Sequence, residues 1–334
     1  MTVAPHLVLV TIDESLRPLS IRVLGAYAQD TLGIRTTLLA ILKPLATFGQ
    51  PMTFSPAEVR HLIRFLADQQ VTHLGFYLMT ATLKPYRLLT QALRQSGFKG
   101  VIMAGGVHVS LCPEESLVEG ADFAVQGPGE LPLKMIMDGA EPSTIPGLVW
   151  RQQGTIRVNH QTPEQKLDLN ALPFPLFRFD QDYVLWDGKL RRLTREINRR
   201  FGSWHGRYYD LVTSRGCVYR CAYCCNVNGA PVRRMSVDRA ISEVKRVRAR
   251  FPELGGINIQ DDSFYAGSPE WLAEFSARMR AEVGLPFIVR MIPRFVTPER
   301  LATLKDGGLA YVTMGLEGSD RINKTLYNRP ESSQ

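Results

Sequence analysis

Four of the five cysteines in this chain of 334 residues lie within nine consecutive positions. Cys217, Cys221 and Cys224 follow a C-x3-C-x2-C spacing, and Cys225 stands directly after them. Thiolates are soft ligands that favour zinc, copper(I) or iron–sulfur clusters. A structural zinc site usually takes its ligands from two separated cysteine pairs, and this chain offers only Cys112 elsewhere. Three thiolates from one loop can instead hold three irons of a [4Fe–4S] cluster and leave the fourth iron open.

Cys225 is not expected to be a cluster ligand, because adjacent residues rarely direct both sulfurs at one small cluster. We interpret it as a packing cysteine or an occasional alternate ligand. A group of buried or redox-active thiols without metal is the competing interpretation of the loop.

The composition is that of a soluble globular protein, with 45% hydrophobic and 22% charged residues. The length favours two domains. The sequence shows neither a membrane-spanning run nor a secretory signal, so we expect a cytoplasmic protein whose cysteines bind metal rather than form disulfides. The net charge of +8 is concentrated around residues 191–200 and 233–250, which we interpret as solvated helix faces and a linker rather than a nucleic-acid site.

Strands alternate with helices in the N-terminal half, which predicts a doubly wound parallel sheet. Such sheets bind ligands beyond the carboxyl ends of their strands. The loops expected there are rich in small and hydroxyl residues: 13–16, 79–82, 105–108 and 127–130. No G-x-G-x-x-G follows the first strand, so a dinucleotide is not the favoured ligand. His108 on its own is more typical of a structural residue than of a ligand.

A second strand–helix series begins near residue 210, with strands expected at 210–214, 256–260, 286–291 and 311–315. Its polar residues follow the strands, where barrel-like α/β domains place their sites. Between the two series, a small hairpin and a stretch containing Pro173 and Pro175 indicate an extended connector. We therefore expect domains at 1–145 and 210–334, joined by a linker at 146–209.

The cysteine spacing, with Tyr223 as the aromatic residue before Cys224, resembles the signature of the radical S-adenosylmethionine superfamily. The resemblance implies that the open iron binds the amine and carboxylate of S-adenosylmethionine, and that one electron from the cluster then releases a 5′-deoxyadenosyl radical. Gly318 replaces the serine that usually ends the family's ribose-binding segment. The implied S-adenosylmethionine contacts are Tyr223, Asp261, Asp262, Gly315 and Glu317.

The N-terminal half resembles the cobalamin-binding domain of class B radical enzymes, through segments 105–108, 113–115 and 127–130. Pro128 replaces a glutamate usual in the last segment, and no D-x-H-x-x-G occurs, so no histidine of that motif can ligate cobalt. The implied cobalamin contacts are Ser15, Met79, Thr80, Ala81, Thr82, Gly105, Gly106, His108, Gly127 and Glu130.

The resulting fold prediction is an α/β chain with a Rossmann-like cobalamin-binding domain followed by a partial (β/α) radical SAM barrel. The family's barrel has six strands, whereas we expect four after the linker. We therefore expect either a fragment or a barrel that a partner completes, with a frayed polar tail at 328–334.

The resemblance favours a cobalamin-dependent methyltransferase that acts on an unactivated carbon or phosphorus of a small molecule or peptide. It also implies an electron donor such as flavodoxin or ferredoxin. Alternatives are an oxidative cyclase of the anaerobic tetrapyrrole type and a cofactor-binding module without turnover. A tRNA methylthiotransferase is disfavoured because the N-terminal half has only Cys112, where that group carries three cysteines.

Overall fold

The computed structural model describes residues 4–44, 52–160, 167–226 and 230–329. The chain forms two compact units, one of Met1–Leu167 with Leu172–Phe201 and one of Asp168–Ala171 with Gly202–Gln334. Residues 330–334 of the predicted tail lie outside the described residues. None of the described helices is both long enough and apolar enough to cross a bilayer.

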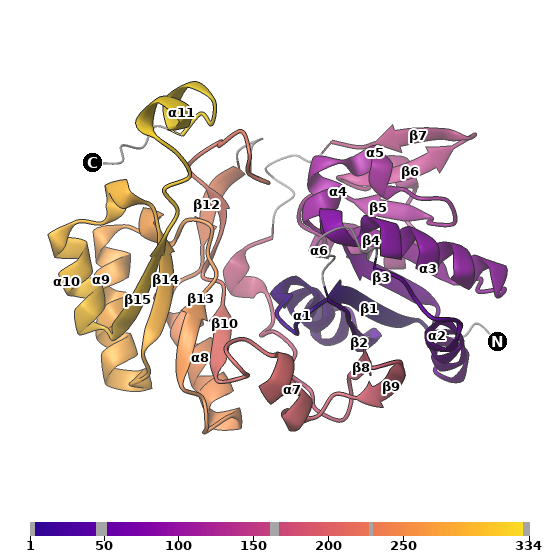
Figure 1. Ribbon diagram of the computed structural model, residues 1–334, viewed down its shortest axis with the longest axis horizontal. Coiled ribbons are helices and arrows are strands. Elements are labelled where there is room, and N and C mark those ends of the chain that lie inside the picture. Colours follow the sequence, from indigo (N-terminus) through magenta and orange to yellow (C-terminus); the bar gives the residue numbers. More distant parts are fainter. Residues whose placement is uncertain (1–3, 45–51, 161–166, 227–229, 330–334) are drawn as a thin grey trace. The chain divides into compact units, whose positions relative to one another are not determined.

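The first unit is built on a nine-stranded sheet in the order β7-β6-β5-β4-β3-β1-β2-β8-β9 (Figure 1). Strands β2, β1, β3, β4 and β5 are parallel, which confirms the predicted doubly wound sheet. The parallel strands that follow the prediction are β1 (His6–Asp13), β2 (Arg35–Leu42), β3 (His73–Tyr77), β4 (Val101–Gly105) and β5 (Phe123–Val125).

The central parallel strands of this sheet are buried on both faces, as their continuous apolar sequences require. All eight residues of β1 are buried. Val8 and Val10 join the core on one face, whereas Leu7 and Leu9 join the core on the other. The helices of this unit are α1 (Leu19–Ala26), α2 (Pro56–Asp68), α3 (Leu83–Gln95), α4 (Val107–Leu111), α5 (Pro113–Ser116), α6 (Glu130–Met137) and α7 (Arg195–Phe201).

The segment 146–209, expected as a linker that contains one small hairpin, supplies four strands and a helix to the first unit. The first two of these strands are the predicted hairpin. The hairpin of β6 (Leu148–Gln152) and β7 (Thr155–Val158) adds antiparallel to β5. The hairpin of β8 (Tyr183–Trp186) and β9 (Lys189–Arg192) adds beside β2. Its turn residues Asp187 and Gly188 both have positive φ, so an Asp-Gly hairpin signal was present in the sequence.

The second unit holds the four predicted strands as a parallel sheet in the order β10-β13-β14-β15 (Figure 1). One face of the sheet packs on helices, as the contact between Phe287 and Phe275 of α9 shows. The elements are β10 (Tyr208–Leu211), α8 (Val237–Arg250), β13 (Gly256–Ile259), α9 (Pro269–Arg278), β14 (Phe287–Met291), α10 (Pro298–Asp306) and β15 (Leu309–Met314). A two-stranded ribbon of β11 (Ser214–Cys217) and β12 (Ala230–Arg234) and the short helix α11 (Asp320–Thr325) complete the described part.

Candidate functional site

The cysteine loop leaves the end of β11, whose last residue is Cys217. The pairing of β11 with β12 is irregular between Arg215 and Cys217, where Gly216 has a φ of 95°. A left-handed backbone is accessible to glycine at no steric cost, so Gly216 allows the strand to turn into the loop. Along that loop Cys221 is buried and Cys224 is partly exposed.

The sulfurs of Cys217, Cys221 and Cys224 do not all lie within 4.8 Å of one another. In the described part of the chain, the one group of three cysteine, histidine or acidic ligand atoms that all lie within 4.8 Å of one another involves none of these cysteines. Thiolates bound to one tetrahedral zinc would stand about 3.8 Å apart, given Zn–S bonds of about 2.3 Å. At least one pair of these sulfurs is therefore farther apart than two ligands of a single zinc ion, as expected for ligands to separate irons of a cluster.

Hydrogen bonds to sulfur already surround the loop. The backbone N–H of Tyr219 donates to Cys217 Sγ at 3.5 Å, and the N–H of Asn226 donates to Cys224 Sγ at 3.5 Å. The hydroxyl of Tyr265 also lies 3.5 Å from Cys217 Sγ. Such hydrogen bonds help to set the reduction potential of an iron–sulfur cluster, so the donor set fits the cluster that the sequence predicts.

Tyr223 is connected to the predicted ribose segment through Arg329. The sequence placed Arg329 in a frayed polar tail, which is wrong for this residue, because Arg329 is buried and hydrogen-bonded. The Tyr223 hydroxyl accepts a hydrogen bond from Arg329 Nη1 at 2.6 Å. The same guanidinium donates to the carbonyl of Gly315 at 2.7 Å and pairs with Glu317 Oε1 at 3.4 Å. Arg329 is only 5% exposed, so one buried cation holds three of the five predicted S-adenosylmethionine residues together.

The backbone beside Arg329 is fastened to the cysteine loop. Ala222 N–H donates to the Tyr327 carbonyl at 2.9 Å, and the Asn328 side chain donates to the Arg220 carbonyl at 3.3 Å. The rings of Tyr223 and Tyr327 meet edge to face at 4.9 Å. These contacts join chain segments about a hundred residues apart, so no local sequence motif predicts them.

The adjacent carboxylates Asp261 and Asp262 differ in their surroundings. Asp261 is buried, and its oxygens accept hydrogen bonds from Thr213 and, at 2.7 Å, from the Ser214 hydroxyl. Arg234 Nη1 lies 3.3 Å away. Burial raises the pKa of Asp261, and the neighbouring donors oppose that shift. Asp261 therefore fastens the start of β11 to the end of β13, whereas Asp262 is exposed.

The four loops predicted to bind cobalamin share one edge of the first sheet. They follow β1, β3, β4 and β5, which are parallel, so their carboxyl ends point the same way. The strand order β2-β1-β3-β4-β5 reverses between β1 and β3, which is the switch point where sheets of this type bind ligands.

A glycine pair joins two of these loops closely. The Leu78 N–H donates to the Gly105 carbonyl at 2.7 Å, and the His108 N–H donates to the Leu78 carbonyl at 3.1 Å. Gly106 has a φ of 113°, and a Cβ there would lie 2.8 Å from the Leu78 carbonyl oxygen. Only glycine fits this approach.

Several residues predicted to contact cobalamin instead form hydrogen bonds within their own turns or are buried. Ser15 donates its N–H and its hydroxyl to Asp13 Oδ1, each at 2.9 Å. Thr82 is fully buried and exchanges hydrogen bonds with the backbone of Met79. Glu130 is also buried, at the start of α6. The exposed members of the predicted set are Thr80, Ala81 and Gly127.

Comparison with known families assigns both units. Residues 5–136 match the B12 binding domain, and residues 211–334 match the Radical SAM superfamily. The chain is thus a radical SAM protein of the class B arrangement, with its B12-binding domain first, as the sequence predicted. These families imply a [4Fe–4S] cluster, S-adenosylmethionine and cobalamin as cofactors, and they support a cobalamin-dependent radical SAM enzyme.

Individual proteins add little to this assignment. No curated protein matches the chain. Among solved structures, the chain is similar to the GsuK channel bound to NAD, at 12% identity and a TM-score of 0.27, and to the GsuK RCK domain, at 12% and 0.25. Each match covers 93% of this chain. The first covers 61% of the GsuK channel chain, and the second covers 74% of the RCK domain chain. At these TM-scores the likeness says nothing about fold or ligand.

Proposed function

We propose that this radical SAM protein with a B12-binding domain is a methyltransferase that acts on an unactivated carbon or phosphorus. The observation that carries the proposal is the presence, in one chain, of a three-thiol loop and a B12-binding domain whose predicted ligand loops share one edge of the sheet. When bound, the cluster and S-adenosylmethionine supply a radical, and cobalamin supplies a carrier for a methyl group.

In the second unit, Cys217, Cys221 and Cys224 bind iron in this proposal. Tyr223 contacts the adenine, and Arg329 holds Tyr223 against the segment of Gly315 and Glu317. This role of Arg329 is supported by its three hydrogen-bonding partners and its burial. Asp262, which follows β13 and is exposed, is the better candidate of the two carboxylates for the methionyl amine, because Asp261 is buried.

In the first unit, cobalamin lies across the carboxyl edge of the sheet in this proposal. Thr80, Ala81 and Gly127 are exposed there and can contact it. Gly105 lets the backbone approach a large ring system closely, whereas Gly106 holds its loop against the Leu78 backbone. Ser15, Met79, Thr82 and Glu130 act by holding the shapes of the binding loops. The side chain of His108 faces inward, so it contributes through its backbone.

The test is to assay the products of S-adenosylmethionine in the anaerobically reconstituted full chain, with a low-potential reductant and with or without hydroxocobalamin. Methyl transfer leaves S-adenosylhomocysteine, whereas reductive cleavage leaves methionine and 5′-deoxyadenosine. We expect both nucleosides, with S-adenosylhomocysteine formed only when hydroxocobalamin is present. The Cys221→Ala variant, which lacks one cluster ligand, should form no 5′-deoxyadenosine.

Other product patterns would contradict the proposal. Formation of 5′-deoxyadenosine without S-adenosylhomocysteine, in protein shown to bind cobalamin, would favour an oxidative reaction such as cyclisation. Formation of neither product, in protein that holds iron and cobalamin, would make the chain a binding module without turnover.

A further inference from the structure

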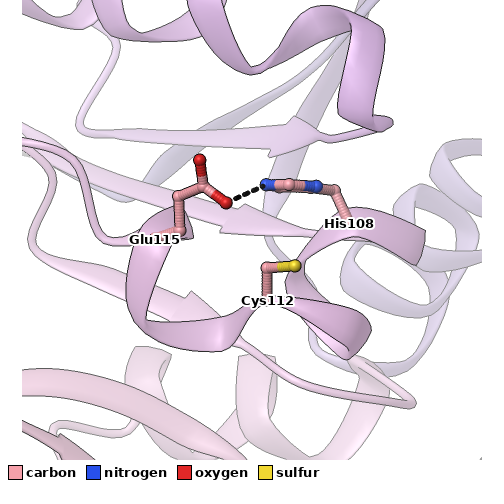
Figure 2. A group of neighbouring side chains, drawn as sticks. All are labelled: His108, Cys112 and Glu115. Atoms are coloured by element: carbon pink, nitrogen blue, oxygen red, sulfur yellow. Dashed lines mark ion pairs between the residues drawn. The ribbon is translucent and has the colours of Figure 1, made fainter.

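A second group of potential metal ligands lies in the first unit, apart from the cysteine loop. Figure 2 shows His108, Cys112 and Glu115 turned toward one another from α4, α5 and the residue between them. One ligand atom of each residue lies within 4.8 Å of those of the other two. His108 Nε2 and Glu115 Oε2 are 3.7 Å apart.

Local helical geometry brings these three residues together. The Cys112 N–H donates to the His108 carbonyl at 2.8 Å, which places Cys112 one turn beyond His108 on the same side. Pro113 then starts α5, and Glu115 lies in its first turn. The chain folds back at this point, so the carboxylate faces the imidazole (Figure 2).

The state of the His108 ring indicates what the group binds. The side chain is 2% exposed, and Nδ1 lies 3.2 Å from the Thr80 hydroxyl. Nε2 is buried and has no hydrogen-bond partner. A buried polar atom left without a partner costs about 1–3 kcal/mol. When Nδ1–H donates to Thr80, the lone pair remains on Nε2, which is the tautomer that binds metals.

We propose that His108 Nε2, Cys112 Sγ and the Glu115 carboxylate bind a divalent transition-metal ion of the zinc class. Imidazole and thiolate together suit zinc and its neighbours rather than magnesium or calcium. Three protein ligands leave a fourth position of a tetrahedral ion for water or an external ligand. This inference does not depend on the proposed methyltransferase function.

The His108 and Glu115 ligand atoms need only a small closure around the ion. Nitrogen and oxygen ligands of a tetrahedral zinc ion lie about 3.3 Å apart, given bonds of about 2.0–2.1 Å. The observed separation of 3.7 Å is close to that value. The Glu115 side chain is 54% exposed and can turn to complete the site without disturbing the core.

A simple ion pair between His108 and Glu115 explains the arrangement less well. A charged hydrogen bond would bring the two atoms to about 2.7–2.9 Å. It would also require a positive charge on a ring that is almost fully buried.

The test uses Co²⁺ as a spectroscopic probe in the full chain carrying Cys217→Ser, Cys221→Ser, Cys224→Ser and Cys225→Ser. Cys112 is then the single thiol, because the chain has five cysteines. We expect one equivalent of Co²⁺ to bind, with a thiolate-to-cobalt charge-transfer band and the absorption of a four-coordinate ion. The band should vanish in Cys112→Ser, and the Co²⁺ affinity should fall at least tenfold in His108→Ala and in Glu115→Gln.

Two controls keep the result interpretable. Glu114→Gln changes a neighbouring exposed carboxylate outside the group and should leave Co²⁺ binding unchanged. Glu115→Gln alters an exposed side chain, so a folding defect cannot explain its loss of affinity. Absence of the band with Cys112 intact would overturn the proposal. So would Co²⁺ binding that is indifferent to His108→Ala, or a His108→Ala effect confined to cobalamin affinity.

Discussion

The two sheets of this protein are both built from parallel strands that alternate with helices, yet they differ in how much of each face is buried. The first sheet is buried on both faces, and β1 contributes a core residue to each face in turn. The second sheet buries Phe287 and Val289 against helices, but Tyr311 of β15 is 59% exposed. The first sheet can therefore offer a ligand only its carboxyl edge, whereas the second also offers a face.

The exposed face of the second sheet carries polar side chains that hydrogen-bond to one another. Asp210 Oδ1 accepts hydrogen bonds from Ser203, from Asn258 at 2.7 Å and from Gln260 at 2.8 Å. Arg290 of β14 pairs with Gln260. A buried carboxylate is tolerated because its partners satisfy it. The same alternation of strands and helices thus supports loops at a sheet edge in the first unit. In the second unit it also forms a sheet face lined by polar side chains.

The largest expected difference between the units is in bound iron, which only the second unit should hold. Replacing Cys217 or Cys224 by Ala should lower bound iron from about four per chain to a trace and abolish formation of 5′-deoxyadenosine, because three thiolates must hold the cluster. The measurement is iron and sulfide analysis after anaerobic reconstitution. Cys225→Ala is the matched control and should keep its iron. Stoichiometric zinc in the unaltered protein would contradict the cluster assignment.

The burial of the two sheets predicts a second difference, in stability. Phe76→Ala and Phe287→Ala remove fully enclosed rings and should each cost about 3–5 kcal/mol in the free energy of unfolding of their own unit. Tyr311→Ala removes a ring that is mostly in solvent and should change that free energy by less than about 0.5 kcal/mol. Urea unfolding followed by circular dichroism measures all three. A large cost for Tyr311→Ala would show that this face is covered in solution.

Arg329 allows a sharper test of the second unit's site. Arg329→Met should raise the KM for S-adenosylmethionine about tenfold or more, because a buried charged group makes hydrogen bonds of about 1.5–3 kcal/mol to three predicted contacts. Iron content should be unchanged. Arg321→Met, at an exposed arginine of α11, is the control. Arg329→Lys should not restore the KM, since lysine lacks the planar fork of donors. An unaltered KM in Arg329→Met would remove Arg329 from the site.

The smallest expected effect concerns pH and belongs to the first unit. Burial lowers the pKa of His6 and of His73, so the folded unit binds fewer protons than the unfolded chain. The contribution of these two histidines to the free energy of unfolding should be fully present above about pH 6.5, the pKa of an unfolded histidine. It should be lost as the pH falls through their lower folded-state pKa values. The second unit has His205 alone, which is exposed. His6→Gln should flatten the pH dependence of urea unfolding of the first unit. An equal acid sensitivity in the second unit would contradict this explanation.

The linker shows where sequence reasoning failed in the fold. Residues 172–178, around Pro173 and Pro175, form neither helix nor strand, as predicted. Farther along, however, the Asp187-Gly188 turn and the apolar residues Val184 and Leu185 form a hairpin beside β2, which the sequence analysis did not predict. Short strands carry too few residues for a clear alternating pattern. Their pairing depends on an edge of β2 that only the folded sheet presents.

The sequence by itself determined the two parallel sheets, the clustering of three thiols in one loop, and the shared edge of the loops predicted to bind cobalamin, because local spacing and strand order specify each of them. Tertiary structure alone decided which of two adjacent carboxylates is buried, and that Arg329 reaches Tyr223. It also turned His108 toward Cys112 and Glu115. These features arise where the chain folds back on itself, and the direction of a side chain there depends on neighbours that no local pattern encodes.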